Sequence, residues 1–238
     1  MKAVIMAGGK GTRLGNLTRT VPKPMIQVCG KPVLEHQLEV MSRHGISEVF
    51  LLTEHLADVI EKGLGGRDHS AIQLRFMREE RPLGTAGALR PLQDRMDDDF
   101  IVIFGDLIMN MDLRRLLEVH KRNRSDVTLV VHPTDHPQDS DLVETDAQDR
   151  ITKIHLKPHA GPVQGLGNSG VHVFSRAIFD YLGGSEKLDL MKGVLPRMLQ
   201  EGRGLYAYNT DEYIKDMGTP DRLARVERDI LAGKVYGH

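Results

Sequence analysis

The sequence predicts an α/β fold with a mostly parallel sheet covered by helices on both faces. Short apolar runs typical of buried strands alternate with stretches of helical periodicity through the first half of the chain. The length of 238 residues suits one large α/β domain with a substantial core. A glycine-rich loop directly after the first apolar run is a third sign, because ligand loops of such folds follow the strands.

The elements of the first half follow from composition and periodicity. Continuous or alternating apolar residues predict strands at 3–6, 49–52, 72–76, 100–104 and 127–131. Helical spacing of apolar residues predicts helices at 32–44, 56–61, 84–92 and 112–121. The first of these helices ends at Gly45, a residue that favours helix termination.

The second half is more mixed and richer in glycine and proline. We expect strands at 152–154 and 171–174, and helices at 190–199 and 220–231. The last helix has a clear start, with Thr219 as the N-cap and Pro220 at its first position. No linker separates the halves, so a single domain over 1–238 is expected.

Composition excludes several classes of protein. Lysine plus arginine total 32 and aspartate plus glutamate total 33, a net charge of −1, so neither nucleic acid nor an anionic membrane is an expected partner. Cys29 is the single cysteine, which fits a reducing compartment, and we interpret it as an ordinary small side chain rather than a nucleophile. The N-terminal apolar run is too short for a signal peptide, so a cytoplasmic protein is expected.

The loop "MAGGKGTRLGNLTRTVPKP" (6–24) has the composition of a polyphosphate site. Its glycines allow close approach of backbone N–H groups to an anion, and its basic residues add full charges. Pro22 and Pro24 fix the backbone on both sides of Lys23, which favours a directed charge over a solvated surface lysine. The glycine spacing fits neither a dinucleotide-binding fingerprint nor a P-loop, which argues against a redox enzyme.

Five segments together resemble the signature of the sugar-1-phosphate nucleotidyltransferases, also called nucleotide-sugar pyrophosphorylases. They cover nearly the whole chain in family order: Gly8 to Pro24, Pro82 to Leu89, Phe104 to Asp106, Asn168 to Val171 and Tyr213 to Pro220. The resemblance implies a Rossmann-like, GT-A-like domain without a C-terminal β-helix. It further implies that 1–135 mainly binds the nucleotide and 136–238 mainly binds the sugar phosphate.

The implied reaction joins a nucleoside triphosphate and a sugar 1-phosphate, releasing pyrophosphate. Because the nucleophile is already an anion, charge neutralisation and in-line alignment are the main tasks. The resemblance implies Arg13 and Lys23 as catalytic residues. It also implies these nucleotide-binding residues: Ala7, Gly8, Gly9, Gly11, Thr12, Arg13, Glu80, Gly84 and Thr85. Close helix packing is the alternative role for Gly84–Gly87.

Asp106 and Asp216 are the implied ligands of Mg²⁺, the expected cofactor. Asp106 follows the most apolar predicted strand, and its alternative role is a cap. Asp216 precedes the capped last helix, and its alternative role is support of that turn. His132, His136, His155 and His159 are scattered without ligand spacing, so we interpret them as polar loop residues rather than a metal site.

The sugar side departs from the common pattern of the family. Asn168 and Lys157 match residues that contact sugar hydroxyls and the sugar phosphate. Leu156, however, stands where a glutamate is usual, so Asp141 or Glu144 is expected to take that role.

Within this family the chain resembles the mannose-1-phosphate guanylyltransferases. In the stretches "DSDLVETDAQDRI", "KPH" and "EYIKDMGTP" it also resembles the D-glycero-D-manno-heptose 1-phosphate guanylyltransferases. GTP with the heptose phosphate is therefore expected, with mannose 1-phosphate or uridylyl, cytidylyl or adenylyl transfer as alternatives. An inactive regulatory subunit of the same fold is a remote alternative, because such subunits usually lose the charged residues kept here. An apolar stripe exposed on the second half would favour a homodimer.

Overall fold

A computed structural model describes residues 1–9, 11–64, 71–134, 136–159, 161 and 163–236. For Thr12, Arg13 and Asn16 it describes the backbone but not the side chain. Contacts within the chain group it into two compact units, each discontinuous in sequence. The first unit comprises 1–81, 103–113 and 212–238, and the second comprises 82–102 and 114–211.

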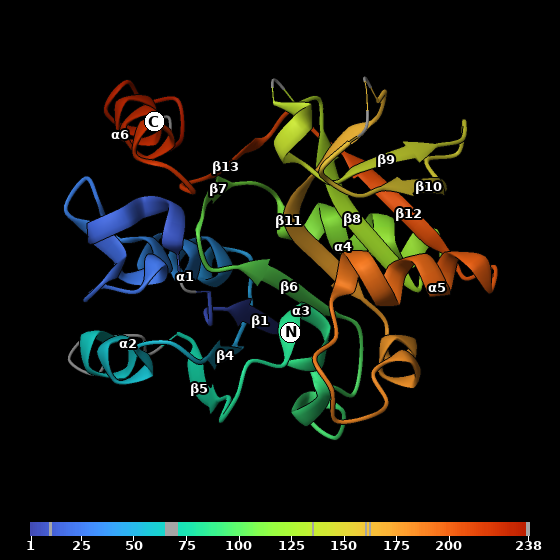
Figure 1. Ribbon diagram of the computed structural model, residues 1–238, viewed down its shortest axis with the longest axis horizontal. Helices are drawn as coiled ribbons and strands as arrows, with labels where there is room; N and C mark the ends of the chain where they lie inside the picture. Colours follow the sequence, from blue (N-terminus) through green and yellow to red (C-terminus); the bar gives the residue numbers. More distant parts are fainter. Residues whose placement is uncertain (10, 65–70, 135, 160, 162, 237–238) are drawn as a thin grey trace. The chain divides into compact units, whose positions relative to one another are not determined.

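The first unit is built on parallel strands, as the sequence predicts. β1 (Lys2–Met6) pairs with β4 (Glu48–Thr53), which pairs with β5 (Gln73–Arg78), all in parallel register. Figure 1 shows the three strands together with α1 (Val33–Arg43) and α2 (Ala57–Leu64). The interiors of β1 and β4 are buried, which explains why their sequences are continuous apolar runs.

Two short antiparallel pairs complete the first unit. β2 (Gln27–Val28) pairs with β3 (Lys31–Pro32), and β7 (Leu107–Asn110) pairs with β13 (Tyr213–Asp216). None of these four strands is predicted from the sequence. α6 (Pro220–Leu231) follows β13 with the bounds and the Thr219 N-cap that the sequence predicts.

The second unit holds a mixed set of strands. β8 (Val127–His132) lies between β11 (Leu166–Phe174), which is antiparallel to it, and β12 (Leu205–Asn209), which is parallel (Figure 1). β9 (Leu142–Thr145) pairs with β11 and with β10 (Ile151–His155), both antiparallel. The predicted strands at 127–131, 152–154 and 171–174 are present, whereas β9 and β12 are not predicted from the sequence.

β6 (Phe100–Phe104) passes from the second unit into the first. The helical segments of the second unit are α3 (Gly84–Gly87), η3 (Arg90–Leu92), α4 (Leu113–Arg122, whose first residue belongs to the first unit), η4 (Pro137–Asp139), η5 (Arg176–Tyr181), η6 (Leu190–Val194) and α5 (Leu195–Gln200). The prediction of one helix over 84–92 is wrong, because the α-helix stops at Gly87 and a short 3-10 turn follows. Pro91 lacks the N–H that a continuing helix would need.

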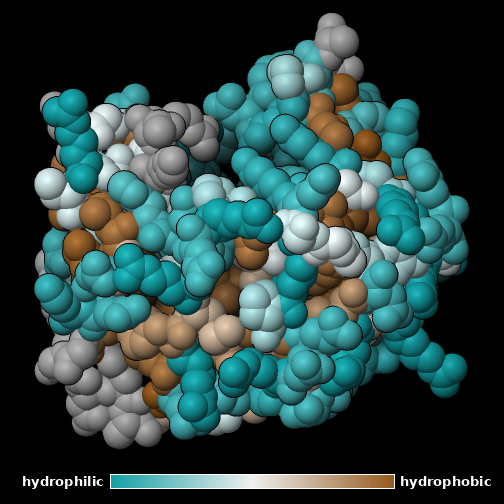
Figure 2. Space-filling model, turned by 60° about the horizontal axis from the view of Figure 1, so that its bottom comes forward, coloured by the Kyte–Doolittle hydropathy of each residue, from teal (hydrophilic) through white to brown (hydrophobic). Residues whose placement is uncertain are grey.

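The surface carries few large apolar side chains. Those exposed in the described part of the chain are Met1, Leu17, Phe76 and Leu231, of which only Leu231 lies in the second half. The face in Figure 2 is mostly hydrophilic, with separate apolar patches. In the described residues, no helix combines the length and hydrophobicity needed to cross a membrane.

Candidate active site

The glycine-rich loop follows β1 and is shaped by contacts that require glycine. Ala7 N continues the strand by donating to Leu52 O at 2.8 Å. Gly11 has a φ of +65°, and a Cβ there would lie 2.7 Å from Thr18 Cγ2 and 2.9 Å from Lys23 Cγ. Thr18 Oγ1 also donates to Gly11 O at 3.0 Å. Close contacts within the loop itself therefore require glycine at position 11, where it lies against Lys23. The close approach of the loop glycines to an anion stays a prediction.

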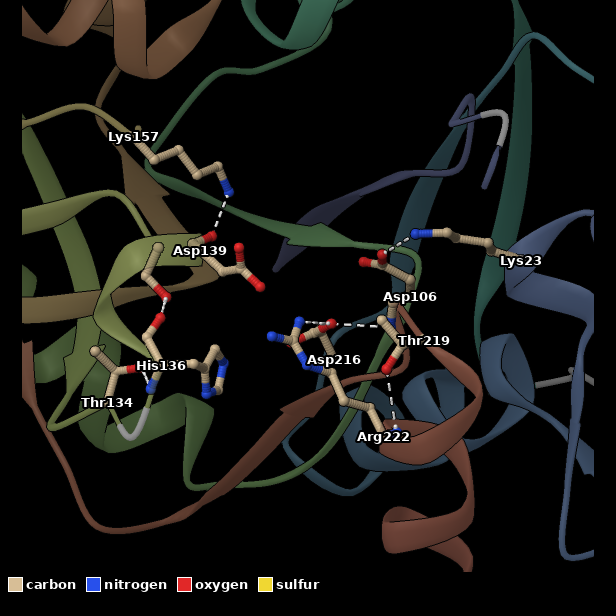
Figure 3. A network of polar contacts seen from close by, with 11 residues as sticks. Lys23, Asp106, Thr134, His136, Asp139, Lys157, Asp216, Thr219 and Arg222 are labelled. Carbon is tan, nitrogen blue, oxygen red and sulfur yellow. Dashed lines mark hydrogen bonds and ion pairs between the residues drawn. The ribbon is translucent and has the colours of Figure 1, made fainter. Parts of the chain in front are cut away.

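Lys23 points at a carboxylate. It opens η2 (Lys23–Met25) after Pro22, whose O accepts a hydrogen bond from Met25 N at 2.8 Å. Its Nζ donates to Asp106 Oδ2 at 2.7 Å (Figure 3). The side chains are only 13% and 24% exposed, so the charges are poorly screened by solvent. Lys23 is therefore not a solvated surface lysine, and Asp106 is not a simple cap.

The position of Asp106 depends on Gly105. A Cβ on Gly105 would lie 3.0 Å from Met6 O and 3.0 Å from Pro24 Cγ, so a side chain there would push β6 away from the loop. Gly105 N donates to Met6 O at 3.0 Å, which ties the residue before Asp106 to the end of β1. Gly105 thus permits the contact between Asp106 and Lys23.

Asp216 is brought opposite Asp106 by the β7–β13 pair. Asp216 pairs with Leu107, and Met217 N donates to Asp106 O at 3.0 Å. Arg222 of α6 bonds both carboxylate oxygens of Asp216 through Nη1, at 2.9 and 3.1 Å (Figure 3). Sequence reasoning missed Arg222, although its place one turn into a helix that follows an aspartate is a usable signal.

Asp216 also supports its own turn, which is the alternative role expected for it. Its Oδ1 accepts from Gly218 N at 2.8 Å, a local side-chain-to-backbone bond typical of aspartate in turns. This structural role does not conflict with metal binding, because a carboxylate offers about four acceptor sites.

The donor set of Asp106 and Asp216 fits Mg²⁺. This ion is usually bound through one or two carboxylates together with substrate phosphates, rather than by a complete protein cage. In the part of the chain that the structure describes, no group of three or more His, Cys, Asp or Glu residues is placed to hold a metal. The two carboxylates each face a cation, Lys23 or Arg222, so their negative charge is compensated without a metal.

In the second unit, Gly84–Gly87 packs against the segment before η6. Gly84 has a φ of +77°, and a Cβ there would lie 2.4 Å from Leu188 O. Leu188 O accepts from Ala86 N and Gly87 N at 3.0 and 3.2 Å. The close packing offered as the alternative is therefore present, and these two N–H groups are already engaged. A contact of Gly84 or Thr85 with a nucleotide stays a prediction.

Side-chain hydrogen bonds of Thr85 link α3 to Asp189 and Leu190 at the start of η6. Thr85 Oγ1 donates to Asp189 Oδ2 at 3.1 Å and accepts from Leu190 N at 2.9 Å. Asp189 Oδ1 also caps η6 by accepting from Lys192 N at 3.0 Å. Asp189 is a second residue that sequence reasoning missed.

Three of the predicted sugar-side residues lie together. Asp141 Oδ1 accepts from Lys157 N at 3.0 Å, and Asp141 O accepts from Asn168 N at 3.0 Å. Lys157 Nζ donates to Asp139 O at 2.8 Å (Figure 3). Glu144 instead pairs with His155 at 2.5 Å, at an exposed position of the β9–β10 ladder. The structure thus groups Asp141, and not Glu144, with the main chain directly after Leu156.

Other predicted residues are placed as follows. The side chains of Thr12 and Arg13 lie outside the described part of the structure. Glu80 is exposed, and Gly8 and Gly9 follow β1 in the first unit. Cys29 lies in the β2–β3 turn with a positive φ, and desolvation together with the Glu227 charge raises the pKa of its thiol, which disfavours a nucleophilic thiolate.

Comparisons with known proteins fit this arrangement. A family model described as nucleotidyl transferase matches residues 2–233. The chain belongs to the nucleotidyl transferase family. A relative in this family, mannose-1-phosphate guanylyltransferase of Mycobacterium tuberculosis (strain ATCC 25618 / H37Rv), is 34% identical over 97% of the chain, which spans 65% of that protein's length.

Two further proteins match the chain over nearly their whole lengths. D-glycero-alpha-D-manno-heptose 1-phosphate guanylyltransferase of Aneurinibacillus thermoaerophilus is 29% identical, and the match covers 97% of this chain and 98% of that protein. The crystal structure of HddC from Yersinia pseudotuberculosis complexed with GMP-PN superposes with a TM-score of 0.82 at 27% identity, covering 96% of this chain and 99% of that one. The family likeness and the fold likeness therefore extend over both units.

Proposed function

We propose that the chain catalyses sugar-1-phosphate nucleotidyl transfer. A phosphate oxygen of the sugar 1-phosphate attacks the α-phosphorus of a nucleoside triphosphate, and the bond to the β-phosphate breaks. A nucleotide sugar forms and pyrophosphate leaves. The observation that carries this proposal is the directed lysine, Lys23, near the end of the glycine-rich loop, whose Nζ lies 2.7 Å from Asp106 Oδ2.

The chemistry explains why such a site suffices. Both reactants are anions, so catalysis requires positive charge at the α-phosphate and a fixed line of attack. Lys23 supplies a partly buried positive charge, and its flanking prolines restrict its direction. Arg13 is proposed to bind the β- and γ-phosphates through its planar guanidinium, which matches phosphate geometry.

Asp106 and Asp216 are proposed to hold Mg²⁺, which would neutralise phosphate charge when bound. Their present partners, Lys23 and Arg222, would then be available to the phosphates. The loop residues Ala7, Gly8, Gly9, Gly11 and Thr12 are proposed to line the triphosphate, as the anion cradle of the loop suggests.

The proposed substrates are GTP and D-glycero-D-manno-heptose 1-phosphate. The heptose-phosphate relative supports this pair, because the match spans 98% of its length. Mannose 1-phosphate is the second candidate, supported by the 34% identity of the mycobacterial relative. Asp141 is proposed to replace the missing glutamate at Leu156, because it bonds the backbone of Lys157 and Asn168.

Pyrophosphate release from the full chain tests the proposal. The assay contains Mg²⁺ and pairs each of four nucleoside triphosphates with a panel of sugar 1-phosphates that includes mannose and the manno-heptose. Release with GTP and the heptose phosphate is expected. Release with GTP and mannose 1-phosphate would favour the second candidate, and release with another base would replace guanine.

Absence of release from every pair would contradict catalysis by this chain. Calorimetry with GTP then separates the remaining explanations. Binding without turnover would indicate the regulatory subunit that the sequence leaves as a remote alternative, whereas no binding would contradict the nucleotide site itself.

A further inference from the structure

Gln37 is a polar side chain in an apolar place. It lies on α1 and is 0% exposed, as are Leu34 and Met41 on the same helix. Helical periodicity would place an apolar residue there. A buried amide without partners costs about 1–3 kcal/mol, so its presence indicates that specific hydrogen bonds are made.

Gln37 makes two hydrogen bonds, one to the residue before the Gly105–Asp106 turn and one to the residue after it. Nε2 donates to Phe104 O at 2.9 Å and to Leu107 O at 2.9 Å. Phe104 ends β6, Leu107 begins β7, and Gly105–Asp106 lies between them. Both partners are carbonyl acceptors, so only the amide nitrogen, with its two protons, can face them.

The oxygen of the same amide shows which function the side chain serves. Gln37 Oε1 is buried and has no hydrogen-bond partner among the described residues. An unsatisfied buried acceptor is unfavourable, and an apolar side chain of similar size would avoid it. The amide therefore contributes to the structure through its two N–H donors, which both bond main-chain carbonyls that flank the Asp106 turn.

We propose that Gln37 is a positioning residue that fixes the Gly105–Asp106 turn and thereby sets the affinity of Asp106 for a divalent cation. The main chain of the turn is also held by backbone bonds from Gly105 N to Met6 O and from Met217 N to Asp106 O. Gln37 adds the link to α1, so the carboxylate is held from a rigid helix. The part of the proposal that concerns the cation rests on the proposed function, in which Asp106 is a metal ligand.

The test replaces Gln37 by methionine, which keeps the length of the side chain but removes the donors. Mn²⁺ binding to the full chain with GTP is followed by electron paramagnetic resonance, together with the kcat and KM of pyrophosphate release. Loss of an outer-shell partner typically weakens metal affinity or activity about 10- to 100-fold, and we expect Gln37→Met to weaken Mn²⁺ binding within that range. The kcat should fall while the KM for the sugar phosphate stays nearly constant.

Val40→Ala is the matched control. Val40 is 0% exposed on the same helix, so its truncation loosens α1 without removing a donor to the turn. We expect Val40→Ala to lower the Tm and leave the Mn²⁺ affinity unchanged. Equal Mn²⁺ affinity of Gln37→Met and the wild type would overturn the cation part of the proposal.

Amide hydrogen exchange keeps the turn testable without any metal. The N–H of Met217 bonds Asp106 O, and we expect it to exchange faster in Gln37→Met but not in Val40→Ala. Unchanged exchange would overturn the claim that Gln37 fixes the turn. If Gln37→Met does not fold, Gln37→Glu replaces it, because a protonated glutamate supplies one donor to the turn. The Mn²⁺ affinity of this variant should fall as the pH rises and the glutamate loses its proton. An Mn²⁺ affinity that does not fall would overturn the proposal.

The outcomes also separate this inference from the proposed function. A wild type that binds Mn²⁺ with GTP but releases no pyrophosphate would contradict the proposed function. The role of Gln37 would then still be tested by comparing the Mn²⁺ affinity of the variants. A wild type that binds no Mn²⁺ would overturn the cation part, and hydrogen exchange would then decide the turn alone.

Discussion

Lys23 and Asp106 form the pair on which the proposed chemistry depends. They are 83 residues apart in sequence and join through a 2.7 Å hydrogen bond in a place where both side chains are mostly buried. A buried ion pair adds little net stability, because desolvation offsets the attraction. Such a pair is better explained by a functional need for a directed positive charge.

Replacing Lys23 by methionine tests that need. Methionine keeps the aliphatic length and removes the charge, and loss of one preorganised electrostatic group typically lowers kcat about 100- to 1000-fold. We expect a fall of that size in pyrophosphate release with an unchanged far-ultraviolet circular dichroism spectrum.

Lys31→Met is the control for a general charge effect. Lys31 pairs with Glu39 on the surface at 2.7 Å and is 36% exposed. The Lys31→Met variant should keep its turnover near the wild-type value. Similar turnover in Lys23→Met and Lys31→Met would contradict the role given to Lys23.

At the scale of the element, the glycine-rich loop and the β7–β13 pair bring the charged groups together. The loop turns at Gly11 so that Lys23 faces Asp106, and the strand pair sets Asp216 beside the same turn. β7 buries Leu107, Ile108 and Met109, but both elements are short. Their conformations therefore also depend on backbone geometry and on a few hydrogen bonds.

Gly11→Ala tests the geometry of the loop. Alanine in the left-handed region is strained by about 1–3 kcal/mol, and its Cβ would press on Thr18 and Lys23. We expect a loss of that order in the free energy of unfolding, measured by urea denaturation, and a lower kcat because Lys23 is displaced.

Gly9→Ala is the control for stability. A Cβ at Gly9 meets no atom of the described residues within 4 Å, so the substitution should not lower the free energy of unfolding. If both variants lost the same stability, the close contacts at Gly11 would not be the cause.

For the whole molecule, buried histidines make stability depend on pH. His172 on β11 is fully buried, and desolvation lowers its pKa to about 4. The pKa values of His36 and His120 are also lowered, chiefly by burial. The unfolded chain binds protons at these side chains near pH 6.5, whereas the folded chain does not. Stability from this source is therefore complete above pH 6.5 and is lost as the pH falls through the interval down to about 4.

His172→Leu isolates the largest of these contributions. Between pH 7.5 and pH 4.5 the wild type should lose about 2–3 kcal/mol more unfolding free energy than the variant, as the pKa difference requires. Urea denaturation of both proteins at the two pH values measures this. An equal loss in the two proteins would show that His172 is not held neutral by the fold.

The sequence by itself determined those features of the fold that local interactions control. Apart from β2, β3, β7 and the interrupted helix at 84–92, the strand–helix order of the first 135 residues follows from residues close in sequence. The α6 helix with its Thr219 cap and the restricted backbone around Lys23 do so as well. The glycine-rich loop was recognisable because its motif is contiguous. Such features need no knowledge of distant partners.

Tertiary structure decided which distant residues meet. Strands as short as β7 and β13 show no clear periodicity, and their pairing joins segments about 100 residues apart. Likewise, Gln37 on the Asp106 turn and Leu188 O on the Gly84–Gly87 helix are visible only in the fold. The physical reason is that the sequence shows which groups need a hydrogen-bond partner but does not identify that partner. Packing of the whole chain determines which group lies close enough to serve.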